Sequence, residues 1–287
     1  GNNTLSVAQT SNIALTSSTS VKNIQTANLV SSGTISAETS AWTGLTTENV
    51  SSVGGGNLKL ASTADLTSTD SALAAGGLTI NGGKTINVAV TGSTSGAITV
   101  GTTTAPTGNV TIANASTGNV NMGAITVSGG KSVSVTQTNG NAVNTTTTMG
   151  TVAVTGSADT TNVTINNAKA ATASATVAGV AGNSVVITDV NTGSATKAGT
   201  ITNVSVNGFT TLSIADNALT TLSVANGSSN IIIDNSGLTT PTNKTLSLTI
   251  NGQTAGTLDD ADIYTTLNVT ASGANSTLAN ITFGGAT

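Results

Sequence analysis

The sequence predicts an all-β protein, a right-handed parallel β-helix (β-solenoid) of short strands with glycine and asparagine corners. Three observations lead to this fold class. Apolar and polar residues alternate with a period of two in runs of four to six residues. Glycine, asparagine or serine bounds these runs, as expected where a chain turns between short strands. Only 1% of the residues are aromatic, so thin cross-sections filled by aliphatic side chains suit the chain better than a wide globular core.

The alternating runs follow one another at roughly ten-residue intervals, the spacing expected for many short strands. Glycines stand between them, and glycine supplies the positive φ that a tight corner needs at no steric cost. The clearest predicted strands are residues 85–90, 97–100, 109–112, 124–127, 132–135, 151–154 and 162–165.

An imperfect repeat is also present. TTLSIADN at 210–217 returns as TTLSVANG at 220–227, with related phrases at 246–252 and 265–269. Two architectures fit: a parallel β-helix or a tandem of antiparallel sandwiches. Short strands, sparse Asn-Gly turns and the lack of an aromatic anchor for each module favour the β-helix. With about 20 residues per coil and a rise of about 4.8 Å, the chain would form about 14 coils and a rod of roughly 65 Å.

Residues 1–287 are predicted to form a single β-solenoid segment of a larger protein, because the chain starts with neither an initiator methionine nor a signal peptide. A joint is expected near 238–244, which contains Pro241. Residues 168–181 are rich in alanine and threonine and are the only helix-like stretch. We interpret them as a wide loop or corner.

The composition excludes several classes of function. The chain has no histidine, cysteine or arginine, and 11 acidic residues against 7 lysines give a net charge of −4. Nucleic-acid binding needs a basic surface and usually stacking aromatics, so no nucleic-acid partner is expected. No apolar run is long enough for a transmembrane helix, so no transmembrane segment is expected. We predict no enzyme, no catalytic residues and no cofactor-binding residues apart from calcium ligands, since isolated carboxylates and lysines offer little acid–base chemistry.

Asp259, Asp260 and Asp262 form the densest acidic cluster, within the irregular segment 253–263. Calcium takes six to eight oxygen ligands, and carboxylates at these offsets could present several to one ion. These three aspartates are therefore the candidate calcium ligands. The competing interpretation is a solvated acidic corner or a helix N-cap. Three further aspartates and one asparagine in loops are better interpreted as turn formers: Asp65, Asp70, Asp189 and Asn191.

Two other functions use β-helices or regular threonine arrays. A carbohydrate-active enzyme on a β-helix would need two placed carboxylates, and Asp216 and Asp234 could stack on one face of adjacent coils. The aromatic side chains that sugar sites use are absent around them. Ice binding would use flat Thr-x-Thr rows, for which residues 136–138 and 145–148 are the hints. Threonine is so abundant here that strand propensity explains these phrases.

Some phrases of the central region are specific enough to compare with a family. GAITVSGGK at 123–131 leads into VSVTQT at 133–138 and GNAVNTT at 140–146, and VVITD follows at 185–189. These phrases resemble the central β-solenoid of bacterial surface-layer (S-layer) proteins of the type I-secreted, calcium-dependent family. The resemblance extends over most of the chain and is strongest in 120–254.

The resemblance implies a secreted, non-enzymatic lattice protein that leaves the cell by type I secretion and assembles outside it with calcium. Calcium sites of this family are mostly Gly- and Asp-rich nonapeptide repeats. No such repeat occurs in this sequence, so no ligand is transferred by motif.

The expected function is a structural S-layer component at the bacterial cell surface: a rigid extracellular β-solenoid that self-assembles with calcium into a two-dimensional array. Its expected partners are copies of itself and, through a region outside this chain, cell-surface polysaccharide. The alternative is the stalk of a secreted bacterial adhesin, which would have the same fold without lateral lattice contacts.

Overall fold

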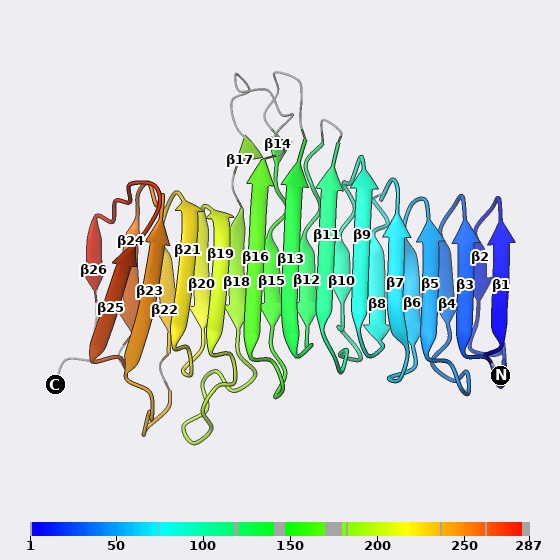
Figure 1. Cartoon of the computed structure of the whole chain (residues 1–287), viewed down its shortest axis with the longest axis horizontal. Helices are drawn as coiled ribbons and strands as arrows, with labels where there is room; N and C mark the ends of the chain where they lie inside the picture. The colour runs from blue at the N-terminus through cyan, green and yellow to red at the C-terminus, as the bar shows by residue number, and fades with distance from the viewer. Residues whose placement is uncertain are drawn as a thin grey trace.

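The fold is a right-handed parallel β-helix, as the alternating runs predict (Figure 1). A computed structural model describes residues 2–73, 75–117, 120–140, 147–169, 180–181, 183–235, 237–261 and 263–282. Every regular element in these ranges is a β-strand. All paired strands are parallel, which excludes the tandem of antiparallel sandwiches.

Two sheets of twelve strands make up the rod, which we call sheet A and sheet B. Sheet A holds β1 (Thr4–Gln9), β3 (Thr26–Ser31), β5 (Thr47–Ser52), β7 (Asp65–Asp70), β9 (Ile86–Gly92), β11 (Val110–Ser116), β13 (Ser132–Asn139), β16 (Asn162–Lys169), β19 (Asn203–Phe209), β21 (Thr221–Gly227), β23 (Thr245–Asn251) and β25 (Thr266–Ala271). Sheet B holds β2 (Ile13–Leu15), β4 (Ile35–Glu38), β6 (Gly56–Leu60), β8 (Leu78–Gly82), β10 (Ile98–Val100), β12 (Ile125–Ser128), β15 (Val152–Thr155), β18 (Ser184–Thr188), β20 (Thr211–Ala215), β22 (Ile231–Asp234), β24 (Thr257–Ala261) and β26 (Asn280–Thr282).

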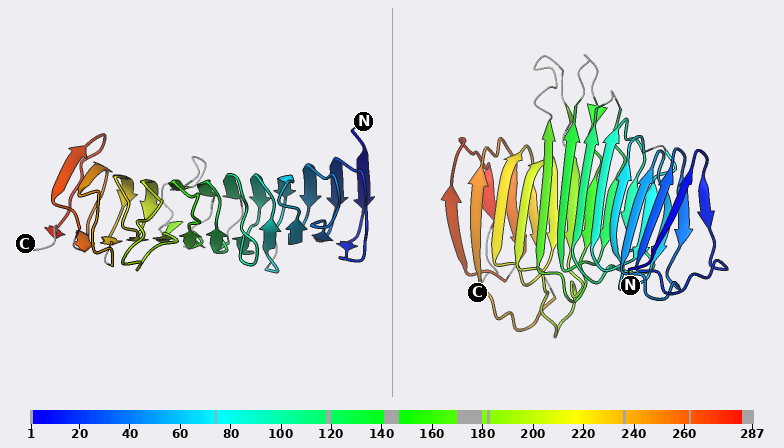
Figure 2. Two further views of the ribbon diagram at one scale, coloured as in Figure 1. Left: turned by 90° about the horizontal axis from the view of Figure 1, so that it is seen from below. Right: turned by 45° about the vertical axis from the view of Figure 1, so that its right-hand side comes forward.

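Each coil contributes one strand to each sheet, and the two sheets face each other as layers along the rod (Figure 2). A short extra pair, β14 (Thr147–Thr148) with β17 (Val180–Ala181), lies at one edge. The described strands therefore form twelve coils, not the expected 14, and at about 4.8 Å per coil they span roughly 55 Å.

Coil length varies, which explains the wrong coil number. Val204 pairs with Leu222, so this coil takes 18 residues, whereas the coil from Val163 to Val204 takes 41. The additional residues of long coils lie outside the two sheets, for example in 190–202, and leave the strand register unchanged.

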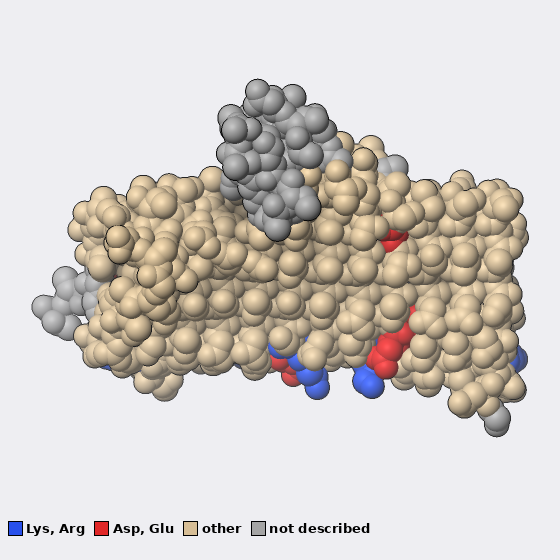
Figure 3. All heavy atoms as spheres, turned by 45° about the horizontal axis from the view of Figure 1, so that its top comes forward, with Lys and Arg blue, Asp and Glu red and all other residues tan. Residues whose placement is uncertain are grey.

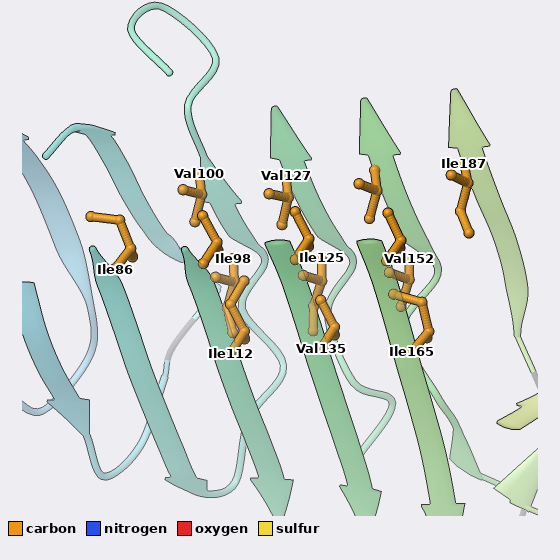
Figure 4. Close-up of a cluster of buried hydrophobic side chains, with 14 of the residues drawn as sticks. Ile86, Ile98, Val100, Ile112, Ile125, Val127, Val135, Val152, Ile165 and Ile187 are labelled. Atoms are coloured by element: carbon orange, nitrogen blue, oxygen red, sulfur yellow. The ribbon is translucent and has the colours of Figure 1, made fainter. Parts of the chain in front are cut away.

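The core lies between the sheets and consists of stacked aliphatic rows. In Figure 4, Ile112 and Val135 of sheet A and Ile98 and Ile125 of sheet B point into this space. Burying each such side chain stabilises the fold by about 1.5–3 kcal/mol. One inward row of sheet A shows the stacking through six successive strands: Val110, Val133, Val163, Val204, Leu222 and Leu248.

Glycine and asparagine adopt positive φ where the chain turns between strands, as the sequence predicts. Gly56 has a φ of +145°, and a Cβ there would lie 1.9 Å from the carbonyl oxygen of Ile35 on the preceding coil. Two asparagines, Asn23 and Asn226, also have positive φ. These backbone conformations are costly for other residue types.

Glu48 interrupts an otherwise aliphatic inward row, between Ala27 and Leu66 on the neighbouring coils. Its side chain is fully buried, and the Thr39 hydroxyl donates to its Oε2 at 2.6 Å. Burial raises the pKa of this carboxyl from 4.5 to about 7, and the Thr39 hydrogen bond only partly offsets it. Removal from water disfavours the charged form, so Glu48 is a local cost to stability at neutral pH.

Two segments singled out in the sequence lie at the margins of the sheets. Residues 238–244 form a loop between β22 and β23, and both sheets continue across it. The start of segment 168–181 belongs to β16, and Val180–Ala181 forms β17. The intervening residues, 170–179, lie outside the described part of the chain.

Substitution of Gly56 by alanine should lower the free energy of unfolding by about 2 kcal/mol or more, because the added Cβ collides with the Ile35 carbonyl and φ is strained. Gly76→Ala is the matched control. A Cβ at Gly76 meets no atom within 4 Å, so this change should cost less than about 0.5 kcal/mol. Urea unfolding of both variants measures the difference, and equal costs would contradict the close coil approach.

Replacement of Glu48 by glutamine should remove a pH-dependent penalty. The folded-state pKa of about 7 exceeds the unfolded value near 4.5, so the favourable contribution of neutral Glu48 is complete below about pH 4.5. It is lost as pH rises through about 7. Relative to Glu48→Gln, the wild type should therefore lose on the order of 3 kcal/mol of unfolding free energy between pH 4.5 and 8. Urea unfolding at these two pH values tests this, and parallel pH profiles of the two proteins would refute it.

Candidate functional site

The outer surface of sheet A carries a continuous row of small polar side chains along the whole rod. Every one of its twelve positions is serine, threonine or asparagine, one from each strand of the sheet. We call it the central outer row. It consists of Ser6, Asn28, Asn49, Thr67, Asn87, Thr111, Ser134, Thr164, Ser205, Ser223, Thr249 and Thr270.

Side-chain amides join neighbouring coils on this surface. Asn49 Nδ2 donates to Asn28 Oδ1 at 2.9 Å in the N-terminal part of the rod. In the C-terminal part, Asn207 Nδ2 donates to Asn166 Oδ1 at 2.6 Å and Asn226 Nδ2 to Asn207 Oδ1 at 2.7 Å. Such ladders add cross-coil hydrogen bonds to those of the backbone and hold the outer side chains in a regular array.

Sheet A is almost without charge on its outside. Among the outward positions of its described strands, Asp65 is the one charged residue, and Lys84 Nζ lies 4.0 Å from its Oδ2. Figure 3 shows one side of the rod nearly free of charge, with the visible lysines and acids mostly along its lower edge. A surface of this kind can be covered by another molecule without removing charges from water, which is the costly step in burying polar surface.

Sheet B has a different outer surface from sheet A. Its strands are shorter, and its outer surface has an open groove of about 700 Å³ beside Glu38, Lys59 and Asn81. Lys59 Nζ lies 2.9 Å from Glu38 Oε1, and the Ser40 hydroxyl donates to the same carboxylate at 2.6 Å. The Ser40 hydrogen bond and Lys59 lower the pKa of Glu38. Glu38 is the only carboxylate among the groove residues described, whereas glycoside hydrolysis uses two.

The other carboxylate pair considered for glycoside hydrolysis does not share a face. Asp216 is fully buried, whereas Asp234 is exposed on the outside of β22. The hypothesis that Asp216 and Asp234 stack together on one face was wrong, because Asp234 ends a strand facing outward and Asp216 follows a strand at an inward corner position.

The predicted calcium ligands fall on different sides of strand β24. Asp259 is exposed and Asp260 is 3% exposed, as expected for consecutive residues of a strand, which point to opposite faces. Asp262 lies outside the described residues. In the described part of the chain, no three Asp, Glu, His or Cys side chains are grouped so as to hold a metal ion. Calcium binding by this triad stays a prediction.

A buried acidic corner lies at the end of sheet B, and the sequence did not predict that its residues lie together. Asp189, Asp216 and Asn235 directly follow β18, β20 and β22, so the register stacks them on successive coils. All three are buried, and Asp260 and Tyr264 are buried beside them. We call these five residues the C-terminal corner.

The acids of this corner are bonded unequally. Asp189 Oδ2 accepts from the backbone N–H groups of Thr200 at 2.6 Å and Ile201 at 3.0 Å, and Oδ1 accepts from that of Asn191 at 2.7 Å. Asp216 Oδ1 accepts from the backbone N–H of Ala218 at 3.0 Å, and the backbone N–H of Asn217 also interacts with this carboxylate, whereas its Oδ2 has no hydrogen-bond partner. Asp189 therefore anchors a loop, whereas Asp216 is left incompletely bonded.

The corner is also electrostatically strained. Burial raises the pKa of Asp216 to about 7, and the nearby Asp189 carboxylate contributes in the same direction. Burial, followed by the carboxylates of Asp216 and Asp260, raises the pKa of Tyr264 above its ordinary value. Both carboxylates are thus close enough to act on the same buried phenol.

Two loops close the corner from outside, at the lower edge of the rod in Figure 1. The backbone N–H and the hydroxyl of Thr239 both donate to the Ala195 carbonyl, at 3.1 and 3.0 Å. Tyr264 Oη and Asn243 Nδ2 both donate to the Leu219 carbonyl, at 2.7 and 3.1 Å. The loops 190–200 and 237–244 are therefore part of one structure with the corner.

None of the described residues forms a helix long and apolar enough to cross a membrane. Comparison with known protein families and with curated protein sequences finds no match to the chain.

Removal of the Asp189 carboxylate should release the loop that it anchors. Asp189→Ala leaves the N–H groups of Asn191, Thr200 and Ile201 without an acceptor and should cost about 2–4 kcal/mol. Trypsin should then cut at the exposed Lys197 at least about tenfold faster, since cleavage follows local opening. Asp159→Ala, at an exposed acid, is the control. Unchanged cleavage in Asp189→Ala would show that the loop is held by other contacts.

Proposed function

We propose that this chain is the rigid strut of an extracellular S-layer-like array, with the outer surface of sheet A as the lateral contact between copies. The observation that carries the proposal is the uncharged central outer row, which runs the full length of the rod. A structural role also agrees with the resemblance to calcium-dependent bacterial surface-layer proteins that are exported by type I secretion.

The area of this surface is adequate for a stable contact. Twelve strands at about 4.8 Å and about six residues per strand at about 3.3 Å give a surface of roughly 55 by 20 Å. That is about 1,100 Å², slightly more than one partner contributes to a typical specific interface. Small side chains held in ladders lose little conformational entropy when covered, which favours close lateral packing.

The stiffness of the rod comes from the repeated pairing of strands along its axis. Each sheet pairs twelve strands through continuous parallel backbone hydrogen bonds, so bending the rod would stretch many of them together. Calcium is the proposed ion for assembly, and exposed carboxylates such as Asp259 are available to it on sheet B. Attachment to cell-surface polysaccharide is proposed for a region outside this chain.

Negative-stain imaging of the secreted full-length protein, with calcium and then with a chelator, tests the assignment. A two-dimensional array that forms with calcium and dissolves without it supports the S-layer function. Isolated rods under both conditions would overturn it and favour the adhesin stalk, which needs stiffness but no lateral contact.

Charge placed on sheet A should abolish the array, whereas the same charge on sheet B should not. Thr111→Lys with Thr164→Lys adds two lysines to the central outer row, two coils apart. Thr79→Lys with Thr126→Lys adds two lysines at the same separation on the outside of sheet B. Covering an unpaired charge costs several kcal/mol, so only the first pair should prevent assembly. Thermal unfolding of both variants controls for folding, and arrays of equal order would refute the role of sheet A.

A further inference from the structure

The C-terminal corner contains a buried carboxylate without a positive partner. Asp216 has no exposed surface, and its Oδ2 accepts no hydrogen bond. The two ion pairs among the described residues lie elsewhere, at Glu38 and Asp65. An ionised carboxylate taken out of water needs a cation or several hydrogen-bond donors to offset the loss of hydration.

Asp70 shows how this fold satisfies a buried aspartate when the role is purely structural. Its Oδ2 accepts from the Ser52 hydroxyl at 2.7 Å and from the backbone N–H groups of Gly54 at 3.1 Å and Gly55 at 2.6 Å. Its Oδ1 accepts from the backbone N–H of Ala72 at 3.0 Å. Asp216 occupies an equally buried corner, but the donors described there, the backbone N–H groups of Ala218 and Asn217, leave its Oδ2 without a hydrogen bond.

The second observation comes from a neutral residue. Asn235 follows Asp216 at the stacked position of the next coil, about 4.8 Å along the rod, and is also fully buried. Its Nδ2 donates to Asp260 Oδ1 at 2.7 Å, whereas its Oδ1 has no hydrogen-bond partner. The corner therefore gathers an unpartnered carboxylate oxygen and an unpartnered amide oxygen next to a second carboxylate.

We propose that Asp216 Oδ2 and Asn235 Oδ1, together with the Asp260 carboxylate, form an internal calcium site. Two carboxylates neutralise a divalent ion, and calcium readily accepts amide, backbone carbonyl and water oxygens as its remaining ligands. Because no three acidic side chains are grouped in the described residues, the site depends on the Asn235 amide and on further neutral oxygens. The ion would tie together the coils of β20, β22 and β24.

The site rests on the proposed function, because it would bind the calcium that assembly of the array is proposed to require. The test of the site does not need an assembled array. Terbium(III) takes the oxygen ligands of calcium and emits when a nearby aromatic group is excited. Tyr264 lies beside Asp216 and Asp260, whereas Trp42 lies in the N-terminal part of the rod. In chelator-treated protein, terbium should give sensitised emission that calcium displaces. Tyr264→Phe should abolish the emission, and Trp42→Phe should retain it.

Asp216→Asn is the decisive variant, with Asp70→Asn as the matched buried control. Calcium should raise the Tm of the wild type and of Asp70→Asn by at least about 4 °C. It should not raise that of Asp216→Asn, whose terbium affinity should be at least about tenfold weaker. Tyr264→Phe should keep the calcium-induced Tm shift, which separates binding from sensitisation.

Two outcomes would overturn the site. One is the absence of any calcium-dependent Tm shift in the wild type. The other is a Tm of Asp216→Asn that exceeds the wild-type value equally with and without calcium, because a proton then neutralises this carboxylate instead of an ion. Both readouts are made on unassembled chain. Failure of the site is therefore distinguishable from failure of the array, which imaging reports.

Discussion

The structure depends on in-register stacking: each paired strand residue of a coil lies directly over the corresponding strand residue of the next coil, held there by parallel backbone pairing. Through twelve coils this constraint converts local sequence into continuous rows. Where an inward position is aliphatic, as at Val133 and Val163, the row becomes a strip of core. Where an outward position is polar, as at Asn166 and Asn207, the row becomes a hydrogen-bonded ladder. The core, the outer surfaces and the stiffness of the rod all follow from this one pairing.

The same stacking makes an isolated charge inside a row conspicuous. Glu48 lies between Ala27 and Leu66, with one hydroxyl to offset its burial, and its pKa rises accordingly. Asp260 likewise follows Ile233 in an otherwise aliphatic row. Corner positions behave differently, because there the chain leaves the sheets and loop N–H groups become available, as they are to Asp70 and Asp189. Burying an aspartate costs little at a corner that supplies such donors, and Asp216 is notable because its corner leaves one carboxylate oxygen without a donor.

Sequence alone could predict the rows but not their alignment. Alternation identified the strands around 85–90 and 162–165, and glycine identified the corners, because both signals are local. The predicted number of coils was wrong because coil length ranges from 18 to 41 residues. No local sequence signal specifies which strands pair with each other. The repeated phrases at 210–217 and 220–227 illustrate this: they look like successive coils, yet β20 lies in sheet B and β21 in sheet A.

The acidic residues show the same limit of local sequence. Asp259 and Asp260 are neighbours in sequence, which suggests a shared site, but strand geometry points them to opposite faces. Asp216 and Asn235 are separated in sequence, so no local pattern connects them, but coil register stacks them. In a β-solenoid, sites are built along the rod axis across coils rather than along the chain. Because loops at the corners can vary without disturbing the strands, the residues at the corners and the residues on the outer sheet surfaces can change independently. A flat contact surface on sheet A and an ion site at the C-terminal corner are therefore compatible in one rod.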